Sequence, residues 1–215
     1  MTTIGRFLSC FAAPLVLLGL SWCAFDLSNV HSSTGLALSI KVKSVKYCRG
    51  DAELFTVHLN LRLRYKNQAD HPIIVHAGDP IIGHVRISRN MADARAGRFE
   101  VDSSADILTA GESPAPLGSA PDKRFVILKP GETFGFDSFA AIVARRDTSP
   151  LIAGTIPPGE HVLQVVVNTW PFSDLDPEKA RSLWFRFGEL HSDPVASEPV
   201  PLTIHQNPEW ADCSE

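Results

Sequence analysis

The segment from Phe55 to Tyr65 alternates strictly between apolar and polar side chains. The apolar set consists of Phe55, Val57, Leu59, Leu61, Leu63 and Tyr65. The polar set consists of Thr56, His58, Asn60, Arg62 and Arg64. Successive side chains of a strand point to opposite faces, so the segment Leu54–Tyr65 is predicted to be an antiparallel strand with one face in the core and one in solvent. A helix would scatter the same hydrophobic residues around its surface.

Similar but shorter segments occur along the rest of the chain. Leu36–Val42 alternates in the same way, and the phase flips before Val45 and Tyr47, which indicates a bulge near Ser44. Further strands are expected at Ile73–His76, at His84–Ser88, around Phe99 and Val101, at Phe125–Leu128, at Leu163–Val167 and at Val200–Ile204. At least seven short strands separated by turns favour an all-β sandwich.

Two Pro-Gly-Glu corners support this interpretation. Proline suits the second position of a tight turn, and the glycine that follows supplies the positive φ of a type II turn. Pro130-Gly131 precedes the aromatic run Phe134–Phe139, and Pro158-Gly159 precedes the apolar strand Leu163–Val167. Neither corner opens a helix, so neither is a phosphate-binding loop.

One helix and one long loop complete the expected elements. Asp176 is predicted as an N-cap with Pro177 in the first helical position, and a short helix follows. The segment 102–123 has no periodicity and is rich in small residues, proline and glycine, so it is predicted to be a loop insertion. A loop of that length is either functional or disordered.

Length and charge limit the function classes. A chain of 215 residues is long enough for one core and does not require two, so one sandwich domain over residues 34–206 and a C-terminal tail over 207–215 are expected. The net charge of −4 and the interspersed charges exclude a nucleic-acid footprint. The richest basic stretch of the chain, Arg62–Lys66, is interpreted as one polar strand face and not as a basic patch.

Residues 1–25 have the pattern of a targeting segment. Arg6 precedes an apolar run that ends at Phe25, which is typical of a secretory signal. The run is also long enough to remain as a membrane anchor, and Cys23 ends a stretch that resembles a lipobox, although Trp22 departs from that pattern. An exported protein of the periplasm or cell envelope, cleaved or tethered to the membrane, is expected.

Cys48 and Cys213 are then the two cysteines of the mature chain. An even count in an oxidising compartment favours one disulfide, and two unpaired thiols are the alternative.

A resemblance to a known family is found in three stretches, which occur in this order: LNLRLRYKNQADHPIIV, LKPGETFGF and IPPGEHVLQVVV. They resemble bacterial exported Ig-like β-sandwich domains, and among these they are similar to the domain of the bacillary intracellular proteinase inhibitor. The resemblance implies an Ig-like antiparallel sandwich of about seven to nine strands. It also implies that the first and last strands lie side by side and parallel, so that a Cys48–Cys213 bridge would clamp the tail. The paired cysteines and the tyrosine corner of immunoglobulin domains are missing.

No motif for catalysis is evident. The chain lacks a Gly-x-Ser-x-Gly elbow, and its paired carboxylates lie in turn-like contexts, so we expect a protein that is not an enzyme and has no cofactor. His71, His76 and His84 are close in sequence and are weak candidates for a metal site, with surface or hydrogen-bonding roles as the alternative.

The aromatic residues near the predicted helix are a second candidate site. Most are expected to pack in the core, and the rest would form an interaction patch; the candidates are Trp170, Phe172, Trp184 and Phe185. The leading functional hypothesis is a binding module for an unknown protein or small ligand. The alternative is a proteinase inhibitor that acts through the loop 103–122.

Overall fold

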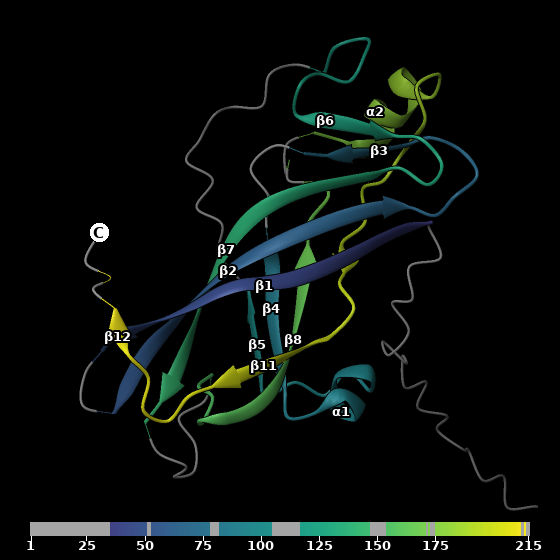
Figure 1. Cartoon of the computed structure of the whole chain (residues 1–215). Coiled ribbons are helices and arrows are strands. Elements are labelled where there is room, and N and C mark those ends of the chain that lie inside the picture. Colours follow the sequence, from purple (N-terminus) through teal and green to yellow (C-terminus); the bar gives the residue numbers. More distant parts are fainter. Residues whose placement is uncertain are drawn as a thin grey trace, which may run out of the picture.

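The computed structural model describes residues 35–50, 53–77, 82–104, 117–146, 154–170, 172, 175–211 and 213. These ranges contain twelve strands and two helices (Figure 1). Three of the strands are only two residues long, so the longer strands agree with the seven to nine expected. The all-β sandwich is confirmed.

The first sheet has the order β12-β1-β2-β7 and forms one layer of the sandwich. Its strands are β1 (Leu36–Arg49), β2 (Leu54–Asn67), β7 (Thr133–Arg145) and β12 (Trp210–Ala211). β1, β2 and β7 are antiparallel neighbours with long continuous registers, and they cross the view of Figure 1 as three long ribbons. The register of β1 against β2 shifts between Val42 and Ser44, which confirms the predicted bulge.

The second sheet lies behind the first in Figure 1 and supplies the other layer. Its strands are β4 (Ile82–Ser88), β5 (Val101–Ser104), β8 (Gly159–Val167), β10 (Val195–Ala196) and β11 (Val200–Ile204). β10 and β11 both pair with β8, and β5 lies at the opposite edge beside β4. Leu163 and Val165 on one face of β8, and Val162 and Val166 on the other, are all buried, so this strand has apolar packing on both faces.

The core lies between these two sheets. The apolar set of β2 is buried along its whole length, with Val57, Leu59, Leu61 and Leu63 fully enclosed, so the alternation prediction is confirmed. Apolar burial of this kind contributes about 25 cal/mol per Å² and is the main term that holds the layers together.

A small third sheet lies beyond one end of the sandwich; we call it the accessory sheet. Its order is β6-β3-β9, with β3 (Ile73–His76), β6 (Phe125–Leu128) and β9 (Glu189–Leu190). The helix α2 (Pro177–Trp184) contacts β9 and begins at Asp176, whose side chain accepts from the N–H of Glu178, as predicted. All four residues of β3 are buried, because packing covers both of its faces.

The Pro130-Gly131 corner connects the accessory sheet to the first sheet, since it joins β6 to β7. Gly131 has a φ of 79°, and the N–H of Glu132 donates to the carbonyl of Lys129 at 2.9 Å, as a type II turn requires. The N–H of Gly131 also donates to the carbonyl of Asn67 at 3.0 Å. This corner therefore ties the end of β2 to the start of β7.

Three expectations need correction. A second helix, α1 (Met91–Arg95), was not predicted; it is capped by Asn90, whose side chain accepts from the N–H of Asp93. The predicted insertion 102–123 begins too early, because 102–104 form the end of β5 through pairing with β4. Within it, 105–116 lie outside the described residues, as does the targeting segment 1–25. Finally, the tail 207–215 is not separate from the sandwich, since it contributes β12.

Candidate functional site

The predicted aromatic patch is mainly a second core. Trp184 is only 1% exposed and packs with Ile74, Phe125, Ala180 and Leu190, between α2 and the accessory sheet. Trp170 and Phe172 are partly buried against the same cluster. Phe185 is 78% exposed, because it follows the last turn of α2 on the side away from the cluster. Of the four candidates, Phe185 alone is exposed in the way that an interaction patch requires.

The ring nitrogens of both tryptophans are satisfied within this cluster. Trp184 Nε1 donates to the carbonyl of Gly118 at 2.9 Å, and Trp170 Nε1 donates to the carbonyl of Leu175 at 2.9 Å. Buried indole groups usually find such partners. The contact with Gly118 fixes the C-terminal end of the predicted insertion on α2.

His71, His76 and His84 have different partners rather than a shared one. His84 Nδ1 lies 2.9 Å from a carboxylate oxygen of Asp102, across the β4–β5 pair. His76 is buried and lies edge-on to the rings of Phe125 and Phe172. Among the described residues, these three histidines do not belong to a group with the close spacing of metal ligands.

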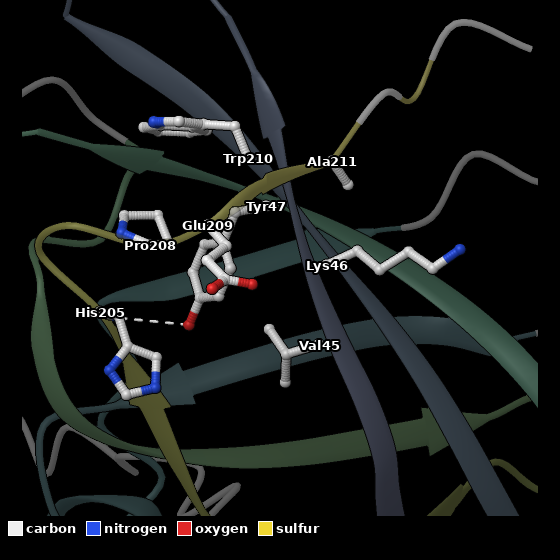
Figure 2. Close-up of a pocket in the computed structure, with 8 residues that line it drawn as sticks. All are labelled: Val45, Lys46, Tyr47, His205, Pro208, Glu209, Trp210 and Ala211. Carbon is white, nitrogen blue, oxygen red and sulfur yellow. Dashed lines mark hydrogen bonds between the residues drawn. The ribbon is translucent and has the colours of Figure 1, made fainter.

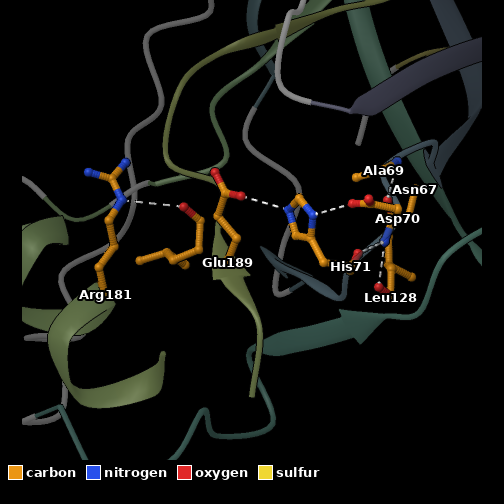
Figure 3. Close-up of polar contacts among 8 residues, drawn as sticks. Asn67, Ala69, Asp70, His71, Leu128, Arg181 and Glu189 are labelled. Atoms are coloured by element: carbon orange, nitrogen blue, oxygen red, sulfur yellow. Dashed lines mark hydrogen bonds and ion pairs between the residues drawn. The ribbon is translucent and has the colours of Figure 1, made fainter. Parts of the chain in front are cut away.

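His71 bridges two carboxylates at the edge of the accessory sheet (Figure 3). Its Nδ1 lies 2.9 Å from Asp70, and its Nε2 lies 2.7 Å from Glu189 on β9. The hydrogen bonds to Asp70 and Glu189 raise the pKa of His71, and the bond to His71 lowers the pKa of Asp70. Protonated His71 therefore joins the loop before β3 to β9.

Cys48 and Cys213 form a disulfide with a Cα–Cα distance of 5.5 Å. The expected parallel neighbour of the first strand is present, but it is β12 and not Val200–Ile204: Cys48 pairs with Ala211 in parallel, whereas β11 pairs with β8. The sequence separation is 165 residues. In the chain-entropy model a loop of this length contributes about 5 kcal/mol, before any native-state strain.

A pocket of about 310 Å³ lies beside this clamp (Figure 2). It is lined by Val45, Lys46, Tyr47, His205, Pro208, Glu209, Trp210 and Ala211. The Tyr47 hydroxyl is engaged by the backbone, since it accepts from the N–H of His205 at 3.2 Å and donates to the carbonyl of Thr203 at 3.3 Å. These bonds attach the chain after β11 to β1, so the tyrosine has a structural role.

The outer face of the first sheet carries a concentration of positive charge that we call the basic face. It is defined by Lys41 and Lys43 on β1 with Arg62, Arg64 and Lys66 on β2, all of them exposed. The register places Lys41 directly opposite Arg62. Asp137 is the one acidic residue in the sequences of β1, β2 and β7.

Asp137 holds two of these cations in place. Its carboxylate lies 3.2 Å from Lys43 Nζ and 3.2 Å from Arg62 Nη1. The bond to Lys43, followed by that to Arg62, lowers the pKa of Asp137. The Arg62 guanidinium lies flat across Gly135, where a Cβ atom would stand only 3.0 Å from Nη2. Glycine at this position therefore lets the guanidinium rest on β7.

Apolar side chains extend the same face toward the other end of β7. Phe139 is 52% exposed and Val143 is 41% exposed, and Asn60 and Thr56 of the polar set are their neighbours on β2. The ring of Phe139 meets the ring of His58 edge-on, with the centroids 4.8 Å apart. The sheet thus presents the basic face at one end, and apolar groups together with Lys46, which lies opposite His58, toward the other.

Sequence reasoning recognised Arg62–Lys66 as a polar strand face but did not expect a basic patch there. The patch arises because the pairing of β1 with β2 places Lys41 and Lys43 beside these cations. The exposure of Phe139 could have been found from its parity, because Phe134 and Phe136 are two residues apart and Phe139 falls on the opposite side of the strand.

The inhibitory loop proposed at 103–122 is described only at its ends. Ser103 lies in β5, and residues 117–122 are described next to α2 and β6, while 105–116 lie outside the described residues.

Neither α1 nor α2 is long and apolar enough to cross a bilayer, and this finding concerns only the described part of the chain.

Comparisons with known proteins add little to this picture. No protein-family model matches the chain. A search of curated proteins finds no match either. One solved structure, described as Northeast Structural Genomics Consortium target SoR45, is similar over 84% of this chain and 96% of its own, at 9% identity and a TM-score of 0.36.

Proposed function

We propose that the chain is an exported, non-catalytic binding module that contacts a protein partner through the outer face of its first sheet. The observation that carries the proposal is the excess of cations on this face. The basic face has five exposed cations, whereas Asp137 is the one acidic residue in the sequences of β1, β2 and β7 and pairs with Lys43 and Arg62. Lys41 also stands directly opposite Arg62, where like charges destabilise a sheet, and an anionic partner would add to the relief that Asp137 gives.

The rest of the face indicates what kind of partner fits. The exposed cations outnumber Asp137 on this face, and the resulting positive field speeds the encounter with an acidic surface. Phe139 and Val143 lie on the same face and offer apolar area that a partner would cover. We therefore infer that the partner presents an acidic protein segment with neighbouring apolar side chains.

A non-catalytic role is supported by where three of the groups with shifted pKa values lie. Of the others, the bond to Arg124 lowers the pKa of Asp122, and burial raises the pKa of Tyr65 and lowers that of His191. Asp70, His71 and Asp137 are exposed members of surface ion pairs, and the shifts in their pKa values follow from those pairs. Among the described residues, none of these three lines the pocket beside Tyr47. Catalytic acids and bases are more often grouped in a cleft.

The binding surface is tested with a labelled synthetic peptide that has a run of glutamates next to a Leu-Phe pair, measured by fluorescence anisotropy. The same peptide with lysines in place of the glutamates reports non-specific binding. The double variant Lys41→Glu/Arg64→Glu reverses two charges that are not held by Asp137. We expect its affinity for the acidic peptide to fall at least about tenfold, and added salt to weaken the native interaction.

The matched control is Lys123→Glu/Lys179→Glu, which makes the same change in net charge at exposed positions away from the first sheet. Equal losses in both double variants would mean that net charge, and not the basic face, determines binding. Phe139→Ser tests the apolar half and should weaken binding without changing its salt dependence. Export is tested separately, by sequencing the N-terminus of the protein recovered from the cell envelope.

A further inference from the structure

The disulfide lies next to an imidazole on the outer face of the first sheet. The Sγ atoms of Cys48 and Cys213 and one ring nitrogen of His58 lie within 4.8 Å of one another. Among the described residues, this is the group of three that has the close spacing of metal ligands. These residue types, two thiols and an imidazole, are typical ligands of zinc.

Strand pairing brings the three ligands together. In the β1–β2 register, Cys48 lies opposite Thr56 and His58 lies opposite Lys46, so Cys48 and His58 are diagonal neighbours on one face. β12 runs parallel to β1 with Ala211 beside Cys48, and Cys213 follows two residues later. The ring of Phe139 supports His58 from β7. The sheet therefore positions Cys48 and His58 before any ion arrives, and the pairing of β12 brings the segment that carries Cys213 beside them.

The distances suit a tetrahedral ion. With Zn–S bonds of about 2.3 Å and Zn–N bonds of about 2.0–2.1 Å, the sulfurs of such a site stand about 3.8 Å apart and each lies about 3.6 Å from the nitrogen. The ring nitrogen of His58 already lies within 4.8 Å of both sulfurs. The two sulfurs are bonded to each other in the disulfide, so they move apart to the zinc-site spacing after the bond is reduced. The Cα–Cα distance of 5.5 Å between the cysteines leaves room for two separate thiolates.

We propose that reduction of the Cys48–Cys213 disulfide creates a Zn²⁺ site formed by the two thiolates and the imidazole of His58. In the first step a dithiol transfers two electrons and two protons to the disulfide, which becomes two thiols while the dithiol becomes a disulfide. In the second step Zn²⁺ binds to both sulfurs and displaces their two protons, and neutral His58 provides a nitrogen lone pair. Water fills the fourth position, as in other zinc sites with three protein ligands.

The disulfide and the ion exclude each other, because each uses both sulfur atoms. The oxidised protein therefore cannot bind zinc at this site. In the reduced protein, the bound ion takes the place of the disulfide as the link between β1 and the C-terminal segment. The cationic contacts of the proposed acidic partner lie farther along the sheet, and the two proposals share only the ring of Phe139, which contacts His58.

The test uses the full chain reduced with a phosphine, because dithiol reductants compete for zinc. Zn²⁺ is titrated against a chromophoric chelator, and Co²⁺ is used as a spectroscopic substitute. We expect one equivalent to bind to the reduced protein and none to the oxidised protein, with a near-ultraviolet thiolate-to-cobalt charge-transfer band. His58→Ala should weaken binding at least tenfold, and His58→Phe should do the same while keeping a ring against Phe139.

His84→Ala is the matched control, since His84 is a half-exposed histidine bonded to a carboxylate on the other sheet. It should bind zinc as the native chain does. Far-UV circular dichroism is recorded at each step. If reduction unfolds the chain, zinc should restore the native spectrum in the native sequence and in His84→Ala but not in the His58 variants. Failure of zinc to bind or to restore the fold, or equal affinity in His58→Ala, would overturn the proposal.

Discussion

Asn67 is the residue whose replacement gives the sharpest test of how the accessory sheet is attached. It is fully buried at the end of β2. Its Nδ2 donates to the carbonyls of His71 and Leu128, both at 2.8 Å, and its Oδ1 accepts from the N–H of Ala69 at 2.8 Å (Figure 3). One amide thus connects β2 with the loop before β3 and with the end of β6.

Asn67→Ala would remove all three of these bonds and leave their backbone partners without them. A net contribution of about 1 kcal/mol for each bond gives a loss of about 3 kcal/mol in the free energy of unfolding. The backbone bonds of residue 67 to Gly131 and Glu132 do not depend on its side chain and should persist. With a urea m-value of about 2 kcal/mol/M, the midpoint should fall by about 1.5 M.

The assay is urea unfolding followed by far-UV circular dichroism and by tryptophan fluorescence. Trp184 and Trp170 lie in the cluster beside the accessory sheet, whereas Trp210 lies in β12. In a Trp22→Phe/Trp210→Phe background, a fluorescence transition ahead of the dichroism transition would show that the accessory region separates first. Asn60→Ala is the control, because Asn60 makes an exposed bond to Ser44 and should cost less than about 0.5 kcal/mol. Similar midpoints for the two variants would refute the reasoning.

Two further predictions concern the accessory sheet. Trp184→Ala should lower the free energy of unfolding by about 3–5 kcal/mol, whereas Phe185→Ala should change it by less than about 0.5 kcal/mol, in the same urea assay. The raised pKa of His71 means that its stabilising effect is complete below its unfolded pKa and disappears as the pH rises through its folded pKa. The thermal midpoint should therefore fall over this range in the native chain and less in His71→Gln; parallel curves would contradict this.

Strands with a strong period of two could be predicted from the sequence. β2 has one buried and one exposed face, so its alternation fixes which residues enter the core, and the bulge near Ser44 is visible as a change of phase. The type II corner at Gly131 was predictable because proline and glycine restrict the backbone in complementary ways.

Features that depend on distant partners could not be predicted in this way. β9 and β12 are two residues long and form only because β3 and β1 lie beside them, so they leave no periodic pattern. α1 is shorter than the window in which helical periodicity appears, although Asn90 and Asp93 are a capping signal.

Prediction of the candidate site from the sequence was limited for the same reason, because its residues also depend on partners that are distant in the chain. Aromatic residues around α2 could have packed inward or formed a surface, and only the position of the accessory sheet shows that Trp184 is buried. His58 could not be connected with the cysteines before the register of β1 against β2 was known.

The partners of β1 impose an order on folding. One edge of this strand pairs with β2, but the other edge meets Ser197 and Trp210, which lie far downstream of it in the chain. A nascent chain therefore holds an open, aggregation-prone strand edge until those residues have been synthesised. Contacts of such long sequence separation slow folding, so we expect the sandwich to be completed only after that point and to benefit from a chaperone that covers β1 meanwhile.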